Sequence, residues 1–278
     1  MTLLARNPAK IPKLLSTPGV TIVEGGLDDL ATLETSLPGH DACIHNALIW
    51  EDEASELQLR DTRASVQLFG ACERAGVEHL IYTSSTAVHR PFQGLMDERA
   101  RLQPDDWYSA TKAAAEAYLS AFSHRTAMRC NVIRPGPTVG GPALEGAPVS
   151  GDLRLRNIVD AALRGHDIAV VLHDGRQFVA ARDLARLYCA LLGSSANRET
   201  YLGVSRDLTL WEDVARVAVS LTGSGSRIRV EDRGLKPGRF DAGKIERDLG
   251  LVFDSQVGLR QHLAHLTAGL SQEPPELC

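Results

Sequence analysis

Three side chains, those of Ser85, Tyr108 and Lys112, are of types that together could exchange a proton with a carbonyl or an alcohol. Tyr108 and Lys112 are four residues apart in a segment of helical period, so both side chains leave the same face of the helix. A lysine ammonium near a phenol favours the phenolate, so we expect the pKa of Tyr108 to fall from about 10 toward working pH. That suits a general acid or base. Ser85, just past a predicted strand, could hydrogen-bond the reacting oxygen.

Each signal alone also has a purely structural explanation. A tyrosine and a lysine four apart occur by chance on solvated helices, and a run of hydroxyl residues such as 82–86 is usually a turn. The segments nevertheless follow one another in order, and Arg134-Pro135-Gly136 comes after the next predicted strand. This order favours the catalytic interpretation.

The surrounding segments predict an α/β fold with a Rossmann-type doubly wound parallel sheet. Short runs rich in β-branched residues alternate with longer amphipathic segments, as βαβ units do. Strands are expected at 2–5, 20–24, 42–46, 79–83 and 128–134, and long helices at about 51–75 and 107–123. A strand that ends at residue 83 would bring Ser85 to the crevice where open α/β sheets bind ligands.

A stretch rich in glycine and proline, 136–151, indicates a domain boundary. We expect a dinucleotide-binding domain over 1–139 and a small α+β substrate-binding domain over 140–278, with 168–194 returning to the first domain. Within the second region the pattern predicts helices near 153–164 and 183–192, and strands near 168–172 and 200–204. Thr209 followed by Glu212 predicts a capping box at the start of a further helix.

The composition argues against several classes of protein. Hydrophobic residues make up 44% and charged residues 23%, and the net charge is only −5, so we expect neither a nucleic-acid partner nor a membrane partner. The five cysteines include no CxxC pair, so neither a disulfide framework nor a metal site is expected. We expect a cytoplasmic protein in a reducing compartment.

Taken together, these motifs resemble the extended short-chain dehydrogenase/reductases, also called the epimerase/dehydratase superfamily. The resemblance rests on 41–48 (DACIHNAL), 82–85 (YTSS), 108–112 (YSATK), 134–141 (RPGPTVGG) and 176–184 (RQFVAARDL). It implies that Tyr108 is the catalytic acid or base, that Lys112 holds the nicotinamide ribose, and that Ser85 positions the reacting oxygen. It also implies an NAD(P)-dependent oxidoreductase or epimerase acting on a carbonyl or secondary alcohol of a small molecule such as a nucleotide sugar. Family members often form homodimers, which we expect here.

The resemblance extends to cofactor and substrate contacts. The expected cofactor contacts are Arg6, Gly26, Leu27, Asn46, Ala47, Thr83, Lys112, Pro135 and Thr138. For the substrate we expect Thr86 and Arg176, the latter at phosphate groups. Arg6 at the end of the strand 2–5 favours NADP over NAD, because an arginine there accommodates a 2'-phosphate; a solvated arginine near a terminus is the alternative.

One family feature is absent from the sequence. If residues 3–5 form the family's second strand, the first strand and the glycine-rich loop that cradles the pyrophosphate have no counterpart here. Because that strand is central, we expect a gap in the sheet and a weakened case for cofactor binding. Three explanations stay open: Met1 is an internal methionine of a longer protein, the other strands close up or borrow a strand from another subunit, or the chain is a degenerate, non-catalytic relative acting as a binding or sensor protein.

Overall fold

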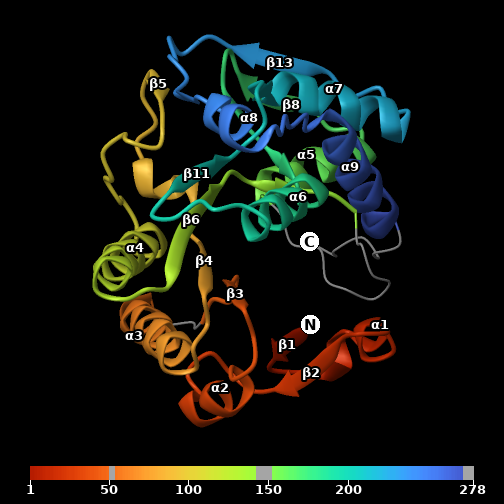
Figure 1. The fold of residues 1–278 in the computed structure, drawn as a ribbon. Helices are drawn as coiled ribbons and strands as arrows, with labels where there is room; N and C mark the ends of the chain where they lie inside the picture. The colour runs from red at the N-terminus through yellow and green to blue at the C-terminus, as the bar shows by residue number, and fades with distance from the viewer. Residues whose placement is uncertain (50–53, 142–151, 272–278) are drawn as a thin grey trace.

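The largest sheet of the protein consists of four parallel strands in the order β11-β6-β4-β3 (Figure 1). The computed structural model describes residues 1–49, 54–141 and 152–271. The four strands are β3 (Ala42–His45), β4 (His79–Thr83), β6 (Arg129–Pro135) and β11 (Thr200–Gly203). β4 and β6 are almost wholly buried because they lie between two other strands and are covered on both faces. The predicted α/β class is confirmed.

Two long helices cover one face of this sheet and pack against each other, α3 (Ala54–Arg74) and α4 (Trp107–Arg125). Residues of both helices join Leu80 and Tyr82 of β4 in one apolar core. α4 begins at a capping box in which the Asp106 side chain accepts from the Ser109 amide at 2.7 Å. This cap fixes where the helix starts and therefore where Tyr108 lies.

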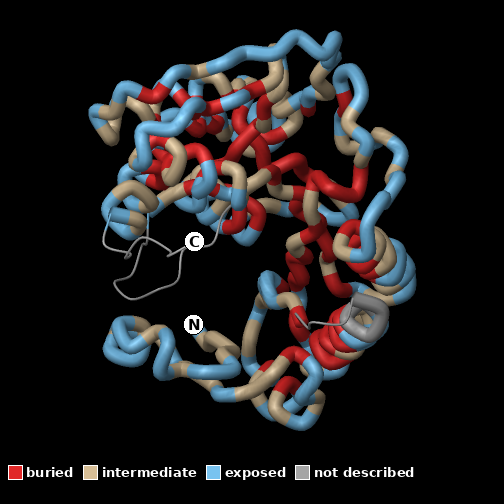
Figure 2. The backbone as a smooth tube through the Cα atoms, turned by 180° about the vertical axis from the view of Figure 1, so that it is seen from behind, coloured by how far each residue is buried: buried red, intermediate tan, exposed pale blue. Residues whose placement is uncertain are grey.

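The first two strands form a separate unit. β1 (Thr2–Ala5) and β2 (Thr21–Glu24) pair with each other in parallel, and in the described residues no strand lies between β1 and β3 (Figure 1). Neither β1 nor β2 has a buried residue (Figure 2), and Ile44 on β3 is 37% exposed. The predicted gap in the sheet is confirmed.

η1 (Pro8–Lys10) and α1 (Pro12–Leu15) connect β1 to β2. α2 (Leu30–Ser36) follows β2 and leads from this unit to β3. α2 packs against α3, and the His40 ring bonds the Thr2 hydroxyl at 2.8 Å. The β1–β2 unit is therefore attached to the rest of the protein by side-chain contacts and by α2, and not by a continuous hydrogen-bonded sheet.

The opposite face of the sheet carries α6 (Ala181–Leu192). Its residues Leu187 and Leu191 pack in one cluster with Ile81 of β4 and Ile133 of β6. Because side chains alternate along a strand, Ile81 points away from the face that Leu80 and Tyr82 give to α3 and α4. A helix distant in sequence thus completes the core beside β4.

The remaining elements gather at the other end of the molecule around α5 (Leu153–Leu163), α7 (Trp211–Thr222) and α9 (Gln256–Leu270), which pack together (Figure 1). The parallel pair β8 (Ile168–Val171) and β13 (Ile228–Glu231) lies beside them. Of the segment 168–194, α6 therefore lies on the main sheet, whereas β8 belongs to this second cluster.

Small two-stranded ladders join the two clusters. They are β7 (Thr138–Val139) with β10 (Val179–Ala180), β9 (Gly175–Arg176) with β12 (Thr209–Leu210), and β5 (Leu95–Met96) with β14 (Arg239–Phe240), which precedes α8 (Gly243–Leu249). The predicted capping box at Thr209 is wrong: Leu210 occupies the N-cap of α7, and the Thr209 hydroxyl contacts that of Ser255 at 3.4 Å. Pairing of Thr209 in β12 placed it in a strand instead. In the described part of the chain no helix combines the length and apolar character that a membrane span requires.

Candidate active site

Ser85 and Tyr108 meet at the carboxyl end of β4. Ser85 is the N-cap of η2 (Thr86–His89), where its Oγ accepts from the Ala87 amide at 3.1 Å. Tyr108 is the second residue of α4, and its side chain lies near that of Ser85, which acts to lower the pKa of the phenol. Both residues therefore lie at the carboxyl end of β4, and their joint action on one reacting oxygen stays a prediction. A serine oxygen that accepts from a backbone amide keeps its own proton for donation.

Lys112 lies one helical turn behind Tyr108 and is only 4% exposed. Its Nζ donates to the Thr83 carbonyl at 3.0 Å and lies 5.1 Å from the centroid of the Tyr82 ring. Burial lowers the pKa of Lys112, while the negative charges of Asp61 and Glu116 oppose that shift. An ammonium with one proton used in this bond has two more to offer to a ligand.

The expectation of a lowered pKa for Tyr108 is wrong for this arrangement. Burial raises the pKa of Tyr108, and the nearby Ser85 side chain only partly offsets that increase. Lys112 Nζ is 6.0 Å from the centroid of the Tyr108 ring and is bonded to the Thr83 carbonyl. The phenol is therefore a neutral proton donor in this state.

A buried ion pair beside the site was missed from sequence. Glu116 follows Lys112 by one more helical turn, so Tyr108, Lys112 and Glu116 form a stripe on α4. Arg134 in β6 donates to Glu116 through Nε at 3.0 Å and through Nη2 at 2.6 Å, and also contacts His89 Nε2 at 3.0 Å. The repeated spacing of four was the signal that could have identified Glu116.

Two predicted cofactor contacts, Asn46 and Thr83, are brought together at the ends of β3 and β4. The Thr83 hydroxyl donates to Asn46 Oδ1, and the Tyr188 hydroxyl of α6 donates to the same oxygen at 2.8 Å. Ala47 follows Asn46 and is exposed. Tyr188 carried no motif and was not predicted.

The other predicted contacts lie at the ends of several strands. Pro135 lies at the end of β6, where its carbonyl accepts from the hydroxyl of buried Thr86 at 3.2 Å, and Thr138 in β7 is exposed. Arg6 is exposed just after β1, across the gap from β3. Gly26 and Leu27 follow β2, and Leu27 is buried in the core.

Arg176 belongs to a cluster of charged and aromatic groups in the C-terminal region. The guanidinium groups of Arg154 and Arg176 lie 4.4 and 5.8 Å from the centroid of the buried Trp211 ring. Both donate to Asp174, at 2.6 Å from Arg154 and 3.4 Å from Arg176. Two arginines that share one carboxylate leave a net positive charge here.

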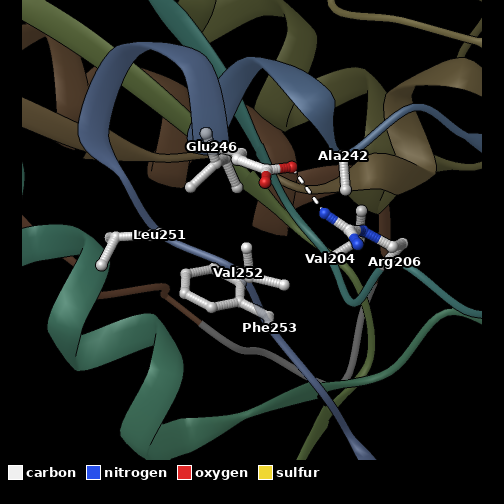
Figure 3. Close-up of a pocket in the computed structure, with 8 residues that line it drawn as sticks. Val204, Arg206, Ala242, Glu246, Leu251, Val252 and Phe253 are labelled. Atoms are coloured by element: carbon white, nitrogen blue, oxygen red, sulfur yellow. Dashed lines mark hydrogen bonds and ion pairs between the residues drawn. The ribbon is translucent and has the colours of Figure 1, made fainter.

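Two cavities lie apart from Ser85, Tyr108 and Lys112. The first, of about 10 Å³, is lined by Val204, Arg206, Ala242, Ile245, Glu246, Leu251, Val252 and Phe253, and an ion pair of 2.5 Å between Arg206 and Glu246 spans it (Figure 3). That volume holds about one water molecule, so it excludes a substrate. The second, of about 290 Å³, lies between α4 and the strands β6 and β11. Of its charged lining residues, Arg134 pairs with Glu116 and Glu199 pairs with Lys244, whereas Arg198 donates to the Ser123 carbonyl at 2.7 Å.

The residues present fit one half of a nicotinamide dinucleotide. Lys112 has free donor capacity, and Asn46, Ala47 and Thr138 are exposed around the carboxyl ends of the strands. In residues 1–49, 54–141 and 152–271, no turn with GxGxxG or GxxGxxG spacing opens a helix toward a pyrophosphate. The nicotinamide side therefore fits, and the described residues supply no diphosphate cradle. They also contain no cluster of side chains suited to a metal ion.

Comparison with known proteins identifies the family. The pattern of the family described as NAD(P)H-binding matches residues 1–150. The chain belongs to this NAD(P)H-binding family of extended short-chain dehydrogenase/reductases. A curated relative of this family member, 3 beta-hydroxysteroid dehydrogenase/Delta 5-->4-isomerase from Mycobacterium tuberculosis, is 27% identical over 176 residues. That match covers 58% of this chain and 45% of the relative.

Solved structures share the fold of this family member. The dTDP-glucose 4,6-dehydratase DesIV from Streptomyces venezuelae, solved with NAD and TYD, has a TM-score of 0.78 at 20% identity, covering 99% of this chain and 89% of that one. UDP-N-acetylglucosamine 4-epimerase from Methanobrevibacter ruminantium M1 has a TM-score of 0.77 at 21% identity, covering 98% and 91%. At these identities the likeness shows the fold alone.

Proposed function

We propose that the protein is an NAD(P)-dependent oxidoreductase or epimerase that acts on a carbonyl or secondary alcohol of a small molecule. The observation that carries this proposal is the proximity of the Ser85 and Tyr108 side chains at the end of β4, with Lys112 buried one helical turn behind Tyr108 and bonded to the Thr83 carbonyl. Membership in an NAD(P)H-binding family supports the choice of cofactor class. The bound nicotinamide would supply or accept the hydride.

The protein groups would manage the proton and the position of the reacting oxygen. Tyr108, whose pKa is raised by burial, is a neutral phenol at neutral pH and can donate its proton to a carbonyl oxygen. Ser85, whose Oγ accepts from the Ala87 amide, would donate its own proton as a second hydrogen bond to that oxygen. Lys112 would give its two remaining N–H groups to the ribose hydroxyls and stabilise negative charge on Tyr108 after proton transfer.

We propose NADP as the preferred cofactor. Arg6 is exposed at the end of β1 and can pair with a 2'-phosphate, whereas a carboxylate at that place would select the free ribose of NAD. The cationic pair Arg154 and Arg176 supports a phosphate-bearing substrate, such as the nucleotide sugars named for several structural neighbours. Thr86 and Ala87 follow Ser85 where 4,6-dehydratases carry an Asp-Glu pair, so dehydration is not proposed.

The proposal extends to assembly, compartment and domains. Leu59 on α3 is 71% exposed and Tyr118 on α4 is 51% exposed, so these helices offer apolar surface to a second copy in a homodimer. Free cysteines in the described residues agree with a reducing cytoplasm. We propose that residues 1–139, joined by the returning segments α6 and β11, form the cofactor domain, and that the rest of 140–278 forms the substrate domain.

A fluorescence titration with NADPH and NADH tests the function. We expect micromolar binding, and turnover of a panel of ketones and nucleotide sugars followed by NADPH absorbance. Tyr108→Phe should keep cofactor affinity and lose turnover, since only the proton donor is removed. Tyr118→Phe on the exposed face of α4 is the matched control and should keep both. The absence of binding at millimolar cofactor, or full turnover in Tyr108→Phe, would refute the proposal.

A further inference from the structure

Tyr188 reaches the crevice from a part of the chain that no motif marked. It lies on α6 and is 8% exposed, so its ring is part of the core that α6 forms with β4 and β6. Its hydroxyl lies 2.6 Å from the Thr83 hydroxyl and 2.8 Å from Asn46 Oδ1. Three polar groups from β4, from the turn after β3 and from α6 thus close a small triangle.

The protons in this triangle determine which way the Asn46 amide points. Tyr188 donates to Asn46 Oδ1, and Thr83 donates to Asn46 Oδ1 or to the Tyr188 oxygen, so both hydroxyl protons find acceptors. With the amide turned over, its nitrogen would donate to the hydroxyls, and one hydroxyl proton would find no acceptor within the triangle. The arrangement with Oδ1 inward is therefore favoured.

The inward oxygen leaves the amide nitrogen facing outward. Asn46 is exposed, and its Nδ2 bonds no group in the described part of the chain. Two N–H donors are therefore presented at the carboxyl edge of the sheet, next to Ala47. The same Thr83 whose hydroxyl completes the triangle receives the Lys112 ammonium on its carbonyl at 3.0 Å. Thr83 thus belongs to the triangle through its hydroxyl and contacts the lysine of the candidate active site through its carbonyl.

We propose that Tyr188 is a positioning residue of the cofactor site, which holds Asn46 so that its amide donates to an oxygen acceptor of the dinucleotide, a ribose hydroxyl or a phosphate oxygen. This inference rests on the proposed function, because it requires that the crevice bind NAD(P). Tyr188 acts through Asn46 and does not touch the reacting atoms. Tyr188 thereby connects α6 to the edge of the sheet where the cofactor would bind.

The test measures the Kd of NADPH by fluorescence. Tyr188→Phe keeps the buried ring and removes only the hydroxyl, and we expect its Kd to rise about fivefold, the effect of one net hydrogen bond. Asn46→Asp, which replaces the donors by a carboxylate, should weaken binding more. Tyr201→Phe is the matched control: Tyr201 is equally buried in β11, but its hydroxyl bonds Asp248 at 3.3 Å, away from the triangle, so its Kd should not change.

A double-mutant cycle separates positioning from general loosening of the fold. If Tyr188 acts through Asn46, then Tyr188→Phe added to Asn46→Ala should cause no further loss of affinity. Additive losses, or an unchanged Kd in Tyr188→Phe while the wild type binds, would overturn the inference alone. If the wild type binds neither NADPH nor NADH, the proposed function fails and the inference fails with it.

Discussion

Arg134 and Glu116 form a buried ion pair with two hydrogen bonds, at 3.0 Å and 2.6 Å. Their side chains are 6% and 7% exposed. The pair joins the end of β6 to α4, the helix that carries Tyr108 and Lys112. Glu116 lies two helical turns after Tyr108 on the same face of α4. The position of the candidate proton donor therefore depends on this charge pair.

Glu116→Ala should destabilise the fold strongly. The change leaves the Arg134 guanidinium buried without its counter-ion, and loss of one partner of a buried pair costs about 3–5 kcal/mol. Urea unfolding followed by circular dichroism measures the difference. Glu212→Ala, which removes a pair between half-buried Glu212 and exposed Arg216 on α7, should cost less than about 1 kcal/mol. Equal effects of the two substitutions would contradict the role given to the buried pair.

Arg6→Ala should change cofactor preference more than cofactor affinity in general. If Arg6 pairs with the 2'-phosphate, we expect the Kd of NADPH to rise about tenfold or more and that of NADH to change little. Parallel fluorescence titrations give both constants. Lys10→Ala removes another exposed cation nearby and serves as the control. A uniform loss for both cofactors would assign Arg6 to the fold of the β1–β2 unit instead.

Gly136→Ala should disturb the contact between β6 and the segment that returns at Gln177. A Cβ at residue 136 would lie 2.4 Å from the Gln177 carbonyl oxygen and 3.1 Å from Val204 Cγ1. Since backbone is the closer obstacle, the strands must separate, which costs about 1–3 kcal/mol. Gly141→Ala meets no atom within 4 Å and should be close to neutral. Thermal unfolding midpoints of the two variants measure this difference in stability. Equal midpoints would contradict the close approach of residue 136 to the Gln177 carbonyl.

Acid should destabilise the protein through His45. Burial lowers the pKa of His45 from 6.5 to about 3, so the folded state holds the neutral ring while the unfolded state takes up a proton. The stability is therefore complete above pH 6.5 and falls as the pH approaches 3, by up to about 4 kcal/mol. Urea midpoints measured across this range should fall steeply in the wild type.

His45→Gln provides the comparison for this pH dependence. Glutamine can keep a hydrogen bond to Ser65 Oγ, which His45 contacts at 2.9 Å, and it does not titrate. The variant should show a flatter decline of stability between pH 6.5 and 3. His124→Gln on the exposed part of α4 should keep the wild-type slope. Identical slopes in all three proteins would exclude His45 as the group responsible.

The helices and strands, and the shared helix face of Tyr108 and Lys112, could be predicted from local sequence because both depend on near neighbours. The helix expected from residue 107 begins there as α4, and the interval of four residues placed Tyr108 and Lys112 on one face. The strand 79–83 was predicted at its observed bounds since a continuous apolar run has few other stable arrangements in a parallel sheet. The gap beside β3 could also be predicted, because a doubly wound sheet needs its central strand and no segment here supplied one.

Tertiary structure alone decided the chemistry of the groups and their distant partners. The pKa of Tyr108 rises because burial removes water from the phenol, and burial depends on which elements cover α4. Tyr188 meets Asn46 across 142 residues of chain, a contact set by the packing of α6 on the sheet and by no local periodicity. Sequence thus determined which groups are available and on which face they lie, while packing determined their solvation and the partners that orient them.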